Sequence, residues 1–357
     1  MATAKVIGVG EGSHGTHEHF ALKSKMFQEL VEKHGFTVLA LETNPSSMHK
    51  VNAYITGQSD DLKEAVNGLE MFIWRNTDLR DLLVWMREYN GKHPSAPLKV
   101  IGIDVQNPLA SARRVAELTQ DPELLRALAP FTSLEEGLST ELKKPGAAEQ
   151  FTAYAAAVVN RANALPADTV NLAEIRRLAL NVQQGILAAA GQVPRDELMA
   201  RNVLAELQHH PEARMMLWAH NGHILKAPEA GAEFDMGRRL KDALGHDYRT
   251  VGMTFAGGEV NAVSSEEPNK GFQAIRLADA WPDAPEALMT YTQLTMWLTA
   301  QEMQQGYLAE YFSGRLPIRH IGQTSRSGLL GYTYVNFPEA FDVVVFNQRS
   351  TPSTPAR

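Results

Sequence analysis

Two short motifs contain the residue types that most often carry acid–base catalysis. The first reads Gly-Val-Gly-Glu-Gly-Ser-His-Gly-Thr-His-Glu over residues 8–18, and the second reads Trp-Ala-His-Asn-Gly-His over residues 218–223. In the first motif Glu11 and His14 are three residues apart, so one turn can bring the two side chains together. A carboxylate beside a histidine fixes the imidazole tautomer and keeps its pKa near the working pH of a general base. The pattern therefore predicts an enzyme rather than a turn that only has to be tight.

The elements that must position these residues are short apolar strands that alternate with helical segments. Such alternation is typical of βαβ units, so we expect an α/β fold with a mainly parallel open sheet flanked by helices. Residues 108–212 contain no convincing strand and are rich in Ala, Leu, Glu and Arg, which predicts a helical insertion, and residues 286–311 are expected to be mostly helical. The expected strands are Lys5–Val9, Thr37–Leu41, Lys99–Ile103, Met215–Ala219, Thr250–Phe255 and Val343–Phe346.

The division of the chain follows from this pattern. We expect an α/β catalytic domain, a helical insertion that interrupts it, and a flexible tail that contains two prolines. The expected bounds are residues 1–107 with 213–350 for the catalytic domain, 108–212 for the insertion, and 351–357 for the tail.

Acids and histidines directly follow the first four expected strands. In chain order they are Glu11 and His14, then Glu42, then Asp104, then His220 and His223. Because ligand sites of open α/β sheets lie outside the carboxyl ends of the strands, we expect these side chains to converge on one site. A plainer interpretation is that Glu42 and Asp104 each cap the helix that follows.

Composition and charge exclude several classes of protein. The chain has 357 residues, a net charge of −7 and no basic stripe, so we expect a small-molecule partner and no nucleic acid. The absence of cysteine excludes thiolate nucleophiles, Fe–S sites and disulfides. The sequence contains no apolar run of about 18 residues, so we expect no membrane span. We expect a cytoplasmic location, or a periplasmic or secreted one if a leader has been trimmed.

Three other interpretations of the same motifs compete with a histidine base. Gly10-x-Gly12-x-x-Gly15 matches the dinucleotide fingerprint of an oxidoreductase, but Glu11 would repel the pyrophosphate. Ser13 fails the nucleophile-elbow pattern Gly-x-Ser-x-Gly, because Glu11 occupies the first glycine position. The third alternative is a metal-dependent hydrolase, or a metal- or haem-binding protein without turnover. Its ligands would come from His14, His17, His19, His220, His223, Glu11 and Glu42, although no HExxH motif is present.

The ordered set of motifs resembles the erythromycin esterase family over nearly the whole chain. The two motifs above carry the resemblance, together with six further stretches in the same order. These are Leu39–Glu42, Trp85–Asn90, Ile101–Gln106, Arg195–Asn202, Met236–Gly237 and Phe341–Asp342.

This resemblance implies hydrolysis of a macrolide lactone ester without a metal or any other cofactor. His14 would be the base that activates water, with Glu11 and Glu42 supporting it. Arg195 and the two downstream histidines would line the cleft. The expected catalytic set is His14, Glu11, Glu42, His220, His223 and Arg195.

A macrolide is large, so its cleft is expected to be broad and substantially apolar. The side chains expected to bind substrate lie near a short helical segment at residues 60–67, with one acid from the third strand end. They are Tyr54, Met71, Phe72, Trp74 and Asp104. For any one of the aromatic residues, packing in the core is the plainer interpretation.

Overall fold

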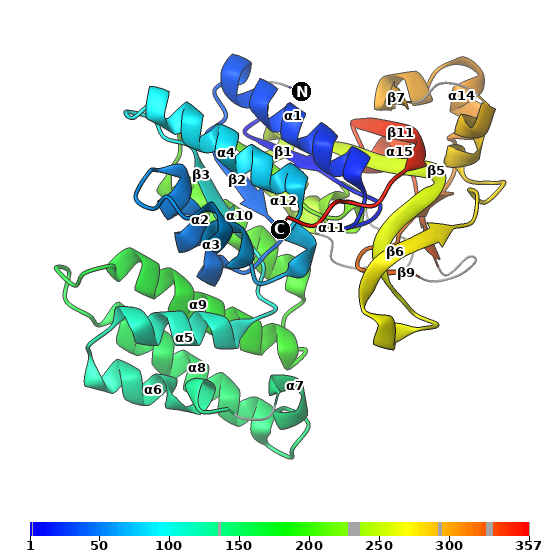
Figure 1. Cartoon of the computed structure of the whole chain (residues 1–357). Helices are drawn as coiled ribbons and strands as arrows, with labels where there is room; N and C mark the ends of the chain where they lie inside the picture. The colour runs from blue at the N-terminus through cyan, green and yellow to red at the C-terminus, as the bar shows by residue number, and fades with distance from the viewer. Residues whose placement is uncertain (2, 135–136, 228–235, 292–294, 326–330, 357) are drawn as a thin grey trace.

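The computed structural model describes the chain apart from residues 2, 135–136, 228–235, 292–294, 326–330 and 357. Its centre is a mostly parallel sheet with helices on both faces (Figure 1). Within the described residues the sheet has nine strands, ordered β3-β2-β4-β1-β5-β11-β7, with β6 and β9 also paired to β5. Of the strands in the described part of this sheet, β6 and β7 alone run antiparallel to their neighbours. The expected α/β fold class is confirmed.

The elements have the following bounds. The strands are β1 (Val6–Val9), β2 (Val38–Leu41), β3 (Lys99–Gly102), β4 (Met215–Trp218), β5 (Tyr248–Ser264), β6 (Phe272–Leu277), β7 (Thr295–Thr299), β8 (Leu316–Arg319), β9 (Thr324–Ser325), β10 (Tyr332–Val335) and β11 (Val343–Ser350). The longer helices are α1 (His17–His34), α2 (Met48–Ile55), α4 (Thr77–Lys92), α5 (Pro108–Leu118), α6 (Pro122–Thr132), α8 (Ala147–Asn163), α9 (Leu172–Ala189), α10 (Arg195–His209) and α12 (Met236–Leu244). The shorter ones are α3 (Leu62–Asn67), α7 (Leu138–Glu141), α11 (Asn221–Ile224), α13 (Ala300–Met303), α14 (Gly306–Tyr311), α15 (Phe337–Ala340) and the 3-10 turn η2 (Phe72–Trp74).

The central strands are short and buried along their length. β1, β2 and β4 read VIGV, VLAL and MMLW, and every residue in them is buried. Parallel strands that are covered on both faces have this continuous apolar character, so burial explains why these segments form strands. The sequence patterns therefore located them to within about one residue of their observed ends.

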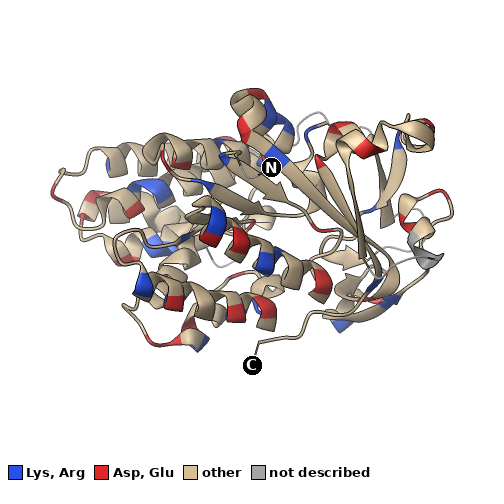
Figure 2. Cartoon of the chain, turned by 90° about the horizontal axis from the view of Figure 1, so that it is seen from above, with Lys and Arg blue, Asp and Glu red and all other residues tan. Residues whose placement is uncertain are grey.

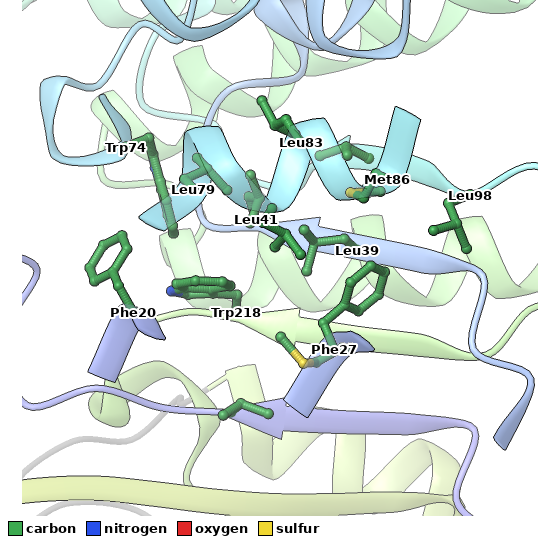
Figure 3. Packing of buried hydrophobic residues seen from close by; sticks show 14 of the residues in the cluster. Phe20, Phe27, Leu39, Leu41, Trp74, Leu79, Leu83, Met86, Leu98 and Trp218 are labelled. Carbon is green, nitrogen blue, oxygen red and sulfur yellow. The ribbon is translucent and has the colours of Figure 1, made fainter. Parts of the chain in front are cut away.

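Helices cover both faces of the sheet and form two hydrophobic cores. On one face α1 and α4 pack with Phe20, Phe27, Leu79 and Leu83 over the strands, and Trp74 and Trp218 lie in the same core (Figure 3). On the other face α10 and α12 pack against the opposite sides of the same strands. The aromatic side chains named in the first core are completely buried, so they stabilise the fold and do not contact solvent.

A stack of helices lies beside the sheet and has a core of its own. The helices α5, α6, α8 and α9 bury apolar residues between 112 and 186 against one another (Figure 1). Among the described residues of 108–209, no strand occurs. α10 differs from the rest of the expected insertion, because its apolar face packs against the sheet. The division into two domains stays a prediction.

The strand β5 is much longer than the sequence pattern indicated. It runs beyond the other strands and pairs with β6 there, forming an arm that is yellow in Figure 1. Gly257 and Gly258 interrupt the strand pattern at the point where the predicted strand stopped. Gly258 has a φ of 119°, and a Cβ there would lie 2.1 Å from the carbonyl oxygen of Ser350. Close contact with β11 therefore requires glycine inside a strand.

Residues 286–311, which were expected to be mostly helical, contain helices and also a strand that was not expected. Their described part begins in a 3-10 turn, forms the antiparallel edge strand β7, and ends in the short helices α13 and α14. β7 pairs residue by residue with β11, from Thr299 opposite Val343 to Thr295 opposite Asn347. Pairing across the sheet, which a local pattern does not record, overrides the helical propensity of this segment.

Residues 351–356, which the sequence assigned to a flexible tail, make main-chain contacts with distant parts of the chain. Pro352 forms a β-bridge with Thr16, and Pro355 forms one with Asn76. Figure 1 shows this red segment crossing the ends of α1 and α4. Ser353 donates from its backbone N to the carbonyl of Gly15 at 2.9 Å, inside the first motif. Prolines suggested fraying, but main-chain partners from distant parts of the chain hold the segment.

Basic and acidic residues are interspersed along the helices (Figure 2). Among the described residues, none of the helices combines the length and the apolar character that crossing a bilayer requires.

Ending the chain after Ser350 should destabilise the protein. Truncation removes the backbone hydrogen bonds by which residues 351–356 bind Gly15, His17, Arg75 and Thr77. At a net value of about 1 kcal/mol for each bond, the free energy of unfolding should fall by about 2–4 kcal/mol. Urea unfolding measures this loss, and a chain that ends after Ala356 is the matched control. An unfolding midpoint equal to that of the control would mean that the segment contributes nothing to stability.

Candidate active site

The carboxyl ends of the central strands lie level with one another. Val9 of β1 pairs with Trp218 of β4, and Leu41 of β2 pairs with the same Trp218. The residues that follow these strands therefore emerge at one edge of the sheet, where α/β folds place their sites. The structure brings together Glu11, His14, Glu42, Asp104 and His220, each at most 6% exposed, and the partly buried His223 and Arg195.

The glycines of the first motif let neighbouring segments approach the turn closely. A Cβ at Gly10 would lie 2.1 Å from Oδ1 of Asn221, and a Cβ at Gly15 would lie 1.9 Å from the carbonyl oxygen of Asn261. Protein atoms fill the space beside both glycines, so this turn has no room there for a pyrophosphate. The glycines that match the dinucleotide fingerprint are needed because other segments of the protein pack closely against this turn.

Ser13 lies inside the same turn and is completely buried. Its Oγ accepts a hydrogen bond from the backbone N of Gly15 at 3.2 Å, and Ser13 forms a β-bridge with Gly322. A nucleophilic serine needs a base at hydrogen-bond distance. Among the described residues, no histidine makes a hydrogen bond with this hydroxyl, so Ser13 fits a role in shaping the turn.

Glu11 joins His14 to a buried lysine. Oε1 of Glu11 lies 2.6 Å from Nδ1 of His14, and Oε2 accepts hydrogen bonds from Nζ of Lys23 at 2.6 Å and Nε1 of Trp218 at 2.9 Å. Burial raises the pKa of Glu11, but the lysine and the histidine outweigh burial, and the pKa is lowered overall. Glu11 is therefore an ionised acceptor. A neutral His14 then carries its proton on Nδ1 and keeps the lone pair of Nε2 for another partner.

Lys23 is a site residue that the sequence analysis missed. Its ammonium group is completely buried, donates to the carbonyl of Ala219 at 3.1 Å, and lies over the ring of Trp218. Burial lowers the pKa of Lys23 to about 8, although Glu11 favours the charged form. The sequence did contain a signal, because Lys23 falls on the apolar face of α1 between Phe20 and Phe27. A charged residue on a buried face requires a partner of opposite charge.

Arg195, the first residue of α10, binds two acids from different strand ends. Its Nε and Nη2 lie 2.8 Å from the two carboxylate oxygens of Asp104, and Nη2 also lies 2.8 Å from Oε1 of Glu42. Burial raises the pKa of Glu42, but His223 and Arg195 together hold it well below its usual range. Burial opposes the charge of Arg195, but the two carboxylates raise its pKa above the ordinary value. Glu42 and Arg195 therefore stay charged at neutral pH, and with Asp104 they form a fixed network of ion pairs.

His223 lies between two carboxylates. Its Nδ1 is 2.9 Å from Oδ1 of Asp196, and its Nε2 is 3.2 Å from Oε1 of Glu42. Burial lowers the pKa of His223, but the two carboxylates outweigh burial and raise it to about 10. His223 is therefore a cation at neutral pH that donates from both nitrogens. Its Nε2 also lies 3.1 Å from Nη1 of Arg195, so in the charged histidine two hydrogen-bond donors face each other at this contact.

His220 has the opposite electrostatic character. Burial, and the charge that His320, His14 and His223 can carry, hold the pKa of His220 well below its usual range. Nδ1 accepts a hydrogen bond from the backbone N of Gly222 at 3.2 Å, so the proton of the neutral ring is on Nε2. This Nε2 is buried and has no hydrogen-bond partner among the described residues. His220 is therefore a neutral donor that a bound molecule could use.

The rings of His14 and His220 meet edge to face, with centroids 5.3 Å apart. One ring has a lone pair without a partner in the described part of the chain, and the other has an N–H without one. A base and a hydrogen-bond donor at the same place are what hydrolysis of an acyl bond needs.

Protein groups already neutralise the acids that could have held a metal. Glu11 binds Lys23, and Glu42 and Asp104 bind Arg195. His17 and His19, the two other candidate ligands, point elsewhere: His17 pairs with Asp78, and His19 packs on Phe255. In the part of the chain that the structure describes, no three His, Asp or Glu side chains are arranged to hold a metal ion.

The residues expected to bind substrate divide into buried and accessible ones. Trp74 is completely buried and donates from Nε1 to the Glu42 carbonyl, and Tyr54 is buried under the guanidinium of Arg87. Asp104 is also completely buried against Arg195. None of these three can line a cleft wall, so that expectation was wrong for them. Phe72 is 41% exposed and Met71 is partly buried, and for these two residues substrate contact stays a prediction.

Comparison with known proteins places this site in a family. The family model described as "Erythromycin esterase" matches residues 31–350 of the chain. The chain belongs to the erythromycin esterase family. It is 27% identical to erythromycin esterase type II of Escherichia coli over 314 residues, which are 76% of this chain and 74% of that protein. It is 20% identical to erythromycin esterase type I of Escherichia coli over 76% of this chain and 75% of that protein. Membership of the family supports a hydrolase of the esterase type.

Solved structures show the same fold. The chain resembles the crystal structure of a Bacillus cereus protein with a TM-score of 0.82 and 21% identity, over 99% of this chain and 90% of that one. It resembles a mutant of the erythromycin esterase EreC in its open conformation with a TM-score of 0.74 and 17% identity, over 99% of this chain and 93% of that one. At these identities the likeness establishes the fold of this erythromycin esterase family member.

Replacing His223 with Gln should remove a pH-dependent part of the stability. The pKa of His223 is about 10 in the folded protein against an ordinary value of 6.5, so the folded state holds an extra proton between these values. His223 therefore contributes stability that is fully present below about pH 6.5 and is lost as the pH rises through about pH 10. Within this window the free energy of unfolding of the wild type should fall, relative to His223→Gln, by up to about 1.4 kcal/mol per pH unit.

Urea unfolding at several pH values from about 7 to about 9.5 measures this difference. His246→Gln, which replaces an exposed histidine, is the control for loss of an imidazole. A difference between the wild type and His223→Gln that does not change with pH would contradict a cationic His223.

Proposed function

We propose that this protein hydrolyses the lactone ester of a macrolide, with His14 as the base that activates water. The observation that carries the proposal is the meeting of His14 and His220 at 5.3 Å between ring centroids, with a free acceptor on one and a free donor on the other among the described residues. The names of the two Escherichia coli relatives supply the substrate class, since both are erythromycin esterases.

The chemical steps follow from the protonation states. Nε2 of His14 takes a proton from water while the water oxygen attacks the ester carbonyl carbon. The carbonyl oxygen becomes an oxyanion, which accepts a hydrogen bond from Nε2–H of His220. When the tetrahedral intermediate collapses, the acyl C–O bond breaks, and the leaving alkoxide takes the proton from the His14 imidazolium. A lactone gives one ring-opened product with the mass of one added water.

The charged groups around the two histidines support these steps without exchanging protons. Ionised Glu11 stabilises the imidazolium that forms on His14, and Lys23 keeps Glu11 ionised in a buried position. Glu42 accepts a hydrogen bond from the backbone N of His220 at 2.9 Å and is itself held by Arg195. This arrangement fixes the directions of both rings before substrate binds.

Incubation of the protein with a panel of 14- and 16-membered macrolides tests the function. We expect a mass gain of one water in at least one of them, with a new carboxylate in the product. The assay is repeated after dialysis against EDTA and again with zinc added back. Turnover that EDTA abolishes and zinc restores would favour the metal-dependent alternative, and no mass gain with any member would contradict the proposed substrate class.

His14→Asn should reduce kcat/KM by at least about 10²-fold, the lower end for loss of a general base. His17→Asn is the matched control, because His17 is three residues away, half exposed and paired with Asp78 outside the site. Steady-state kinetics measure the effect, and circular dichroism checks that both variants fold. A folded His14→Asn variant with a rate near that of His17→Asn would exclude His14 as the base.

His220→Phe keeps a ring of similar size and removes the Nε2–H donor. Loss of one donor to a developing oxyanion costs about 10²–10³-fold in kcat, so we expect that loss with little change in KM. The melting temperature of the variant is measured in parallel, because His220 also caps α11. A variant that loses thermal stability but retains kcat would show that His220 has a structural role only.

A further inference from the structure

A fourth histidine, His320, meets the site from a part of the chain that the sequence analysis did not consider. Its ring centroid lies 4.4 Å from that of His220, with the two planes at 73°. This is a closer ring contact than the 5.3 Å between His14 and His220. His320 is partly exposed, whereas His14 and His220 are buried, so it stands on the solvent side of the pair.

The segment that carries His320 is attached to the first motif by main-chain contacts. Ile321 donates from its backbone N to the carbonyl of Gly12 at 2.9 Å, and His14 donates from its backbone N to the carbonyl of Gly322 at 3.0 Å. Gly322 has a φ of 56°, in the left-handed region, and this turn brings its carbonyl to His14. Three successive residues of the segment therefore contact the site or the turn that bears it.

The other side of the segment is anchored by Arg319. Its buried guanidinium donates to the carbonyls of Phe255, Ala256 and Ala278 and lies over the rings of Phe255 and Tyr332. Three carbonyls and two rings hold this arginine in one position. His320 therefore directly follows a residue whose side chain is held at several points.

The contact with His320 gives the ring of His220 a close neighbour that can restrain its orientation. Apart from the hydrogen bond from Gly222 to Nδ1, the ring of His220 is held by packing, since Nε2 has no partner among the described residues. A ring that must present an N–H in one direction needs neighbours that exclude its other rotamers. Of the described ring contacts of His220, that with His320 is the shortest.

We infer that His320 is a positioning residue that packs against the His220 ring and holds its Nε2–H toward the reacting carbonyl. This inference rests on the proposed function, in which His220 stabilises the oxyanion. The role that the ring contact supports is that of a packing surface for His220. A phenylalanine should therefore replace it, and an alanine should not.

Kinetics of His320→Ala and His320→Phe test the inference. We expect His320→Ala to lower kcat by about 10-fold to 100-fold with KM changed less than about twofold, because misplaced catalytic groups lose rate rather than binding. His320→Phe should keep kcat within about threefold of the wild type. His93→Ala is the matched control, since His93 stacks on Tyr89 at 4.0 Å at the end of α4 and touches none of the site histidines. Equal loss in the alanine and phenylalanine variants would overturn the packing role.

A second measurement does not depend on turnover. The ¹⁵N and ¹H signals of the His220 imidazole, assigned with His220→Phe, should shift or broaden in His320→Ala and stay close to wild type in His320→Phe and His93→Ala. Unchanged His220 signals in a folded His320→Ala variant would overturn the inference, whether or not macrolides are hydrolysed. If the macrolide panel shows no product, the proposed function fails, and these spectra still decide the role of His320.

Discussion

Buried carboxylates that each need a cation are the constraint on which the site depends. Glu11 and Glu42 are almost completely buried, and an unpaired charge in such a place would cost several kcal/mol. Lys23 and Arg195 provide the cations, from α1 and from the start of α10. The other oxygen of Glu11 forms a hydrogen bond with the ring of His14, and the other oxygen of Glu42 accepts one from the backbone N of His220. The paired carboxylates therefore place the proton of neutral His14 on Nδ1 and keep His223 charged.

This constraint also explains why the site draws on distant parts of the sequence. The two cations come from helices on opposite faces of the sheet, which the two hydrophobic cores hold in place, whereas the carboxylates follow its strands. The turn that bears His14 is further held by the segment 319–322 and by the C-terminal segment 351–356. A catalytic turn with so many main-chain partners has little freedom to move, as an electrostatically preorganised site requires.

The sequence predicted those features of the fold and the site that depend on local patterns of residues. Continuous apolar runs predicted the strands β1 to β4. The acids and histidines that follow these strands lie close together, because parallel strands end at one edge of the sheet. Trp74 and Tyr54 were wrongly expected in a cleft, since an apolar ring at helical spacing gives no sign of which side is solvent. Lys23 was missed although its place on an apolar face was visible, and His320 lay in a stretch without a motif. β7 depends on pairing with β11, and the far end of the long β5 depends on pairing with β6, which only the folded chain reveals.

The site depends most on complementary tautomers of two adjacent histidines, which Glu11 fixes on His14 and the backbone N of Gly222 fixes on His220. Long-range ¹H–¹⁵N correlation spectra of the protein with ¹⁵N-labelled histidine measure this most directly, because they show which ring nitrogen carries the proton. In the neutral rings the account predicts a proton on Nδ1 of His14, hydrogen-bonded to Glu11, and a proton on Nε2 of His220. A proton on Nε2 of His14, or on Nδ1 of His220, would contradict the account, because the site would then lack either its base or its donor.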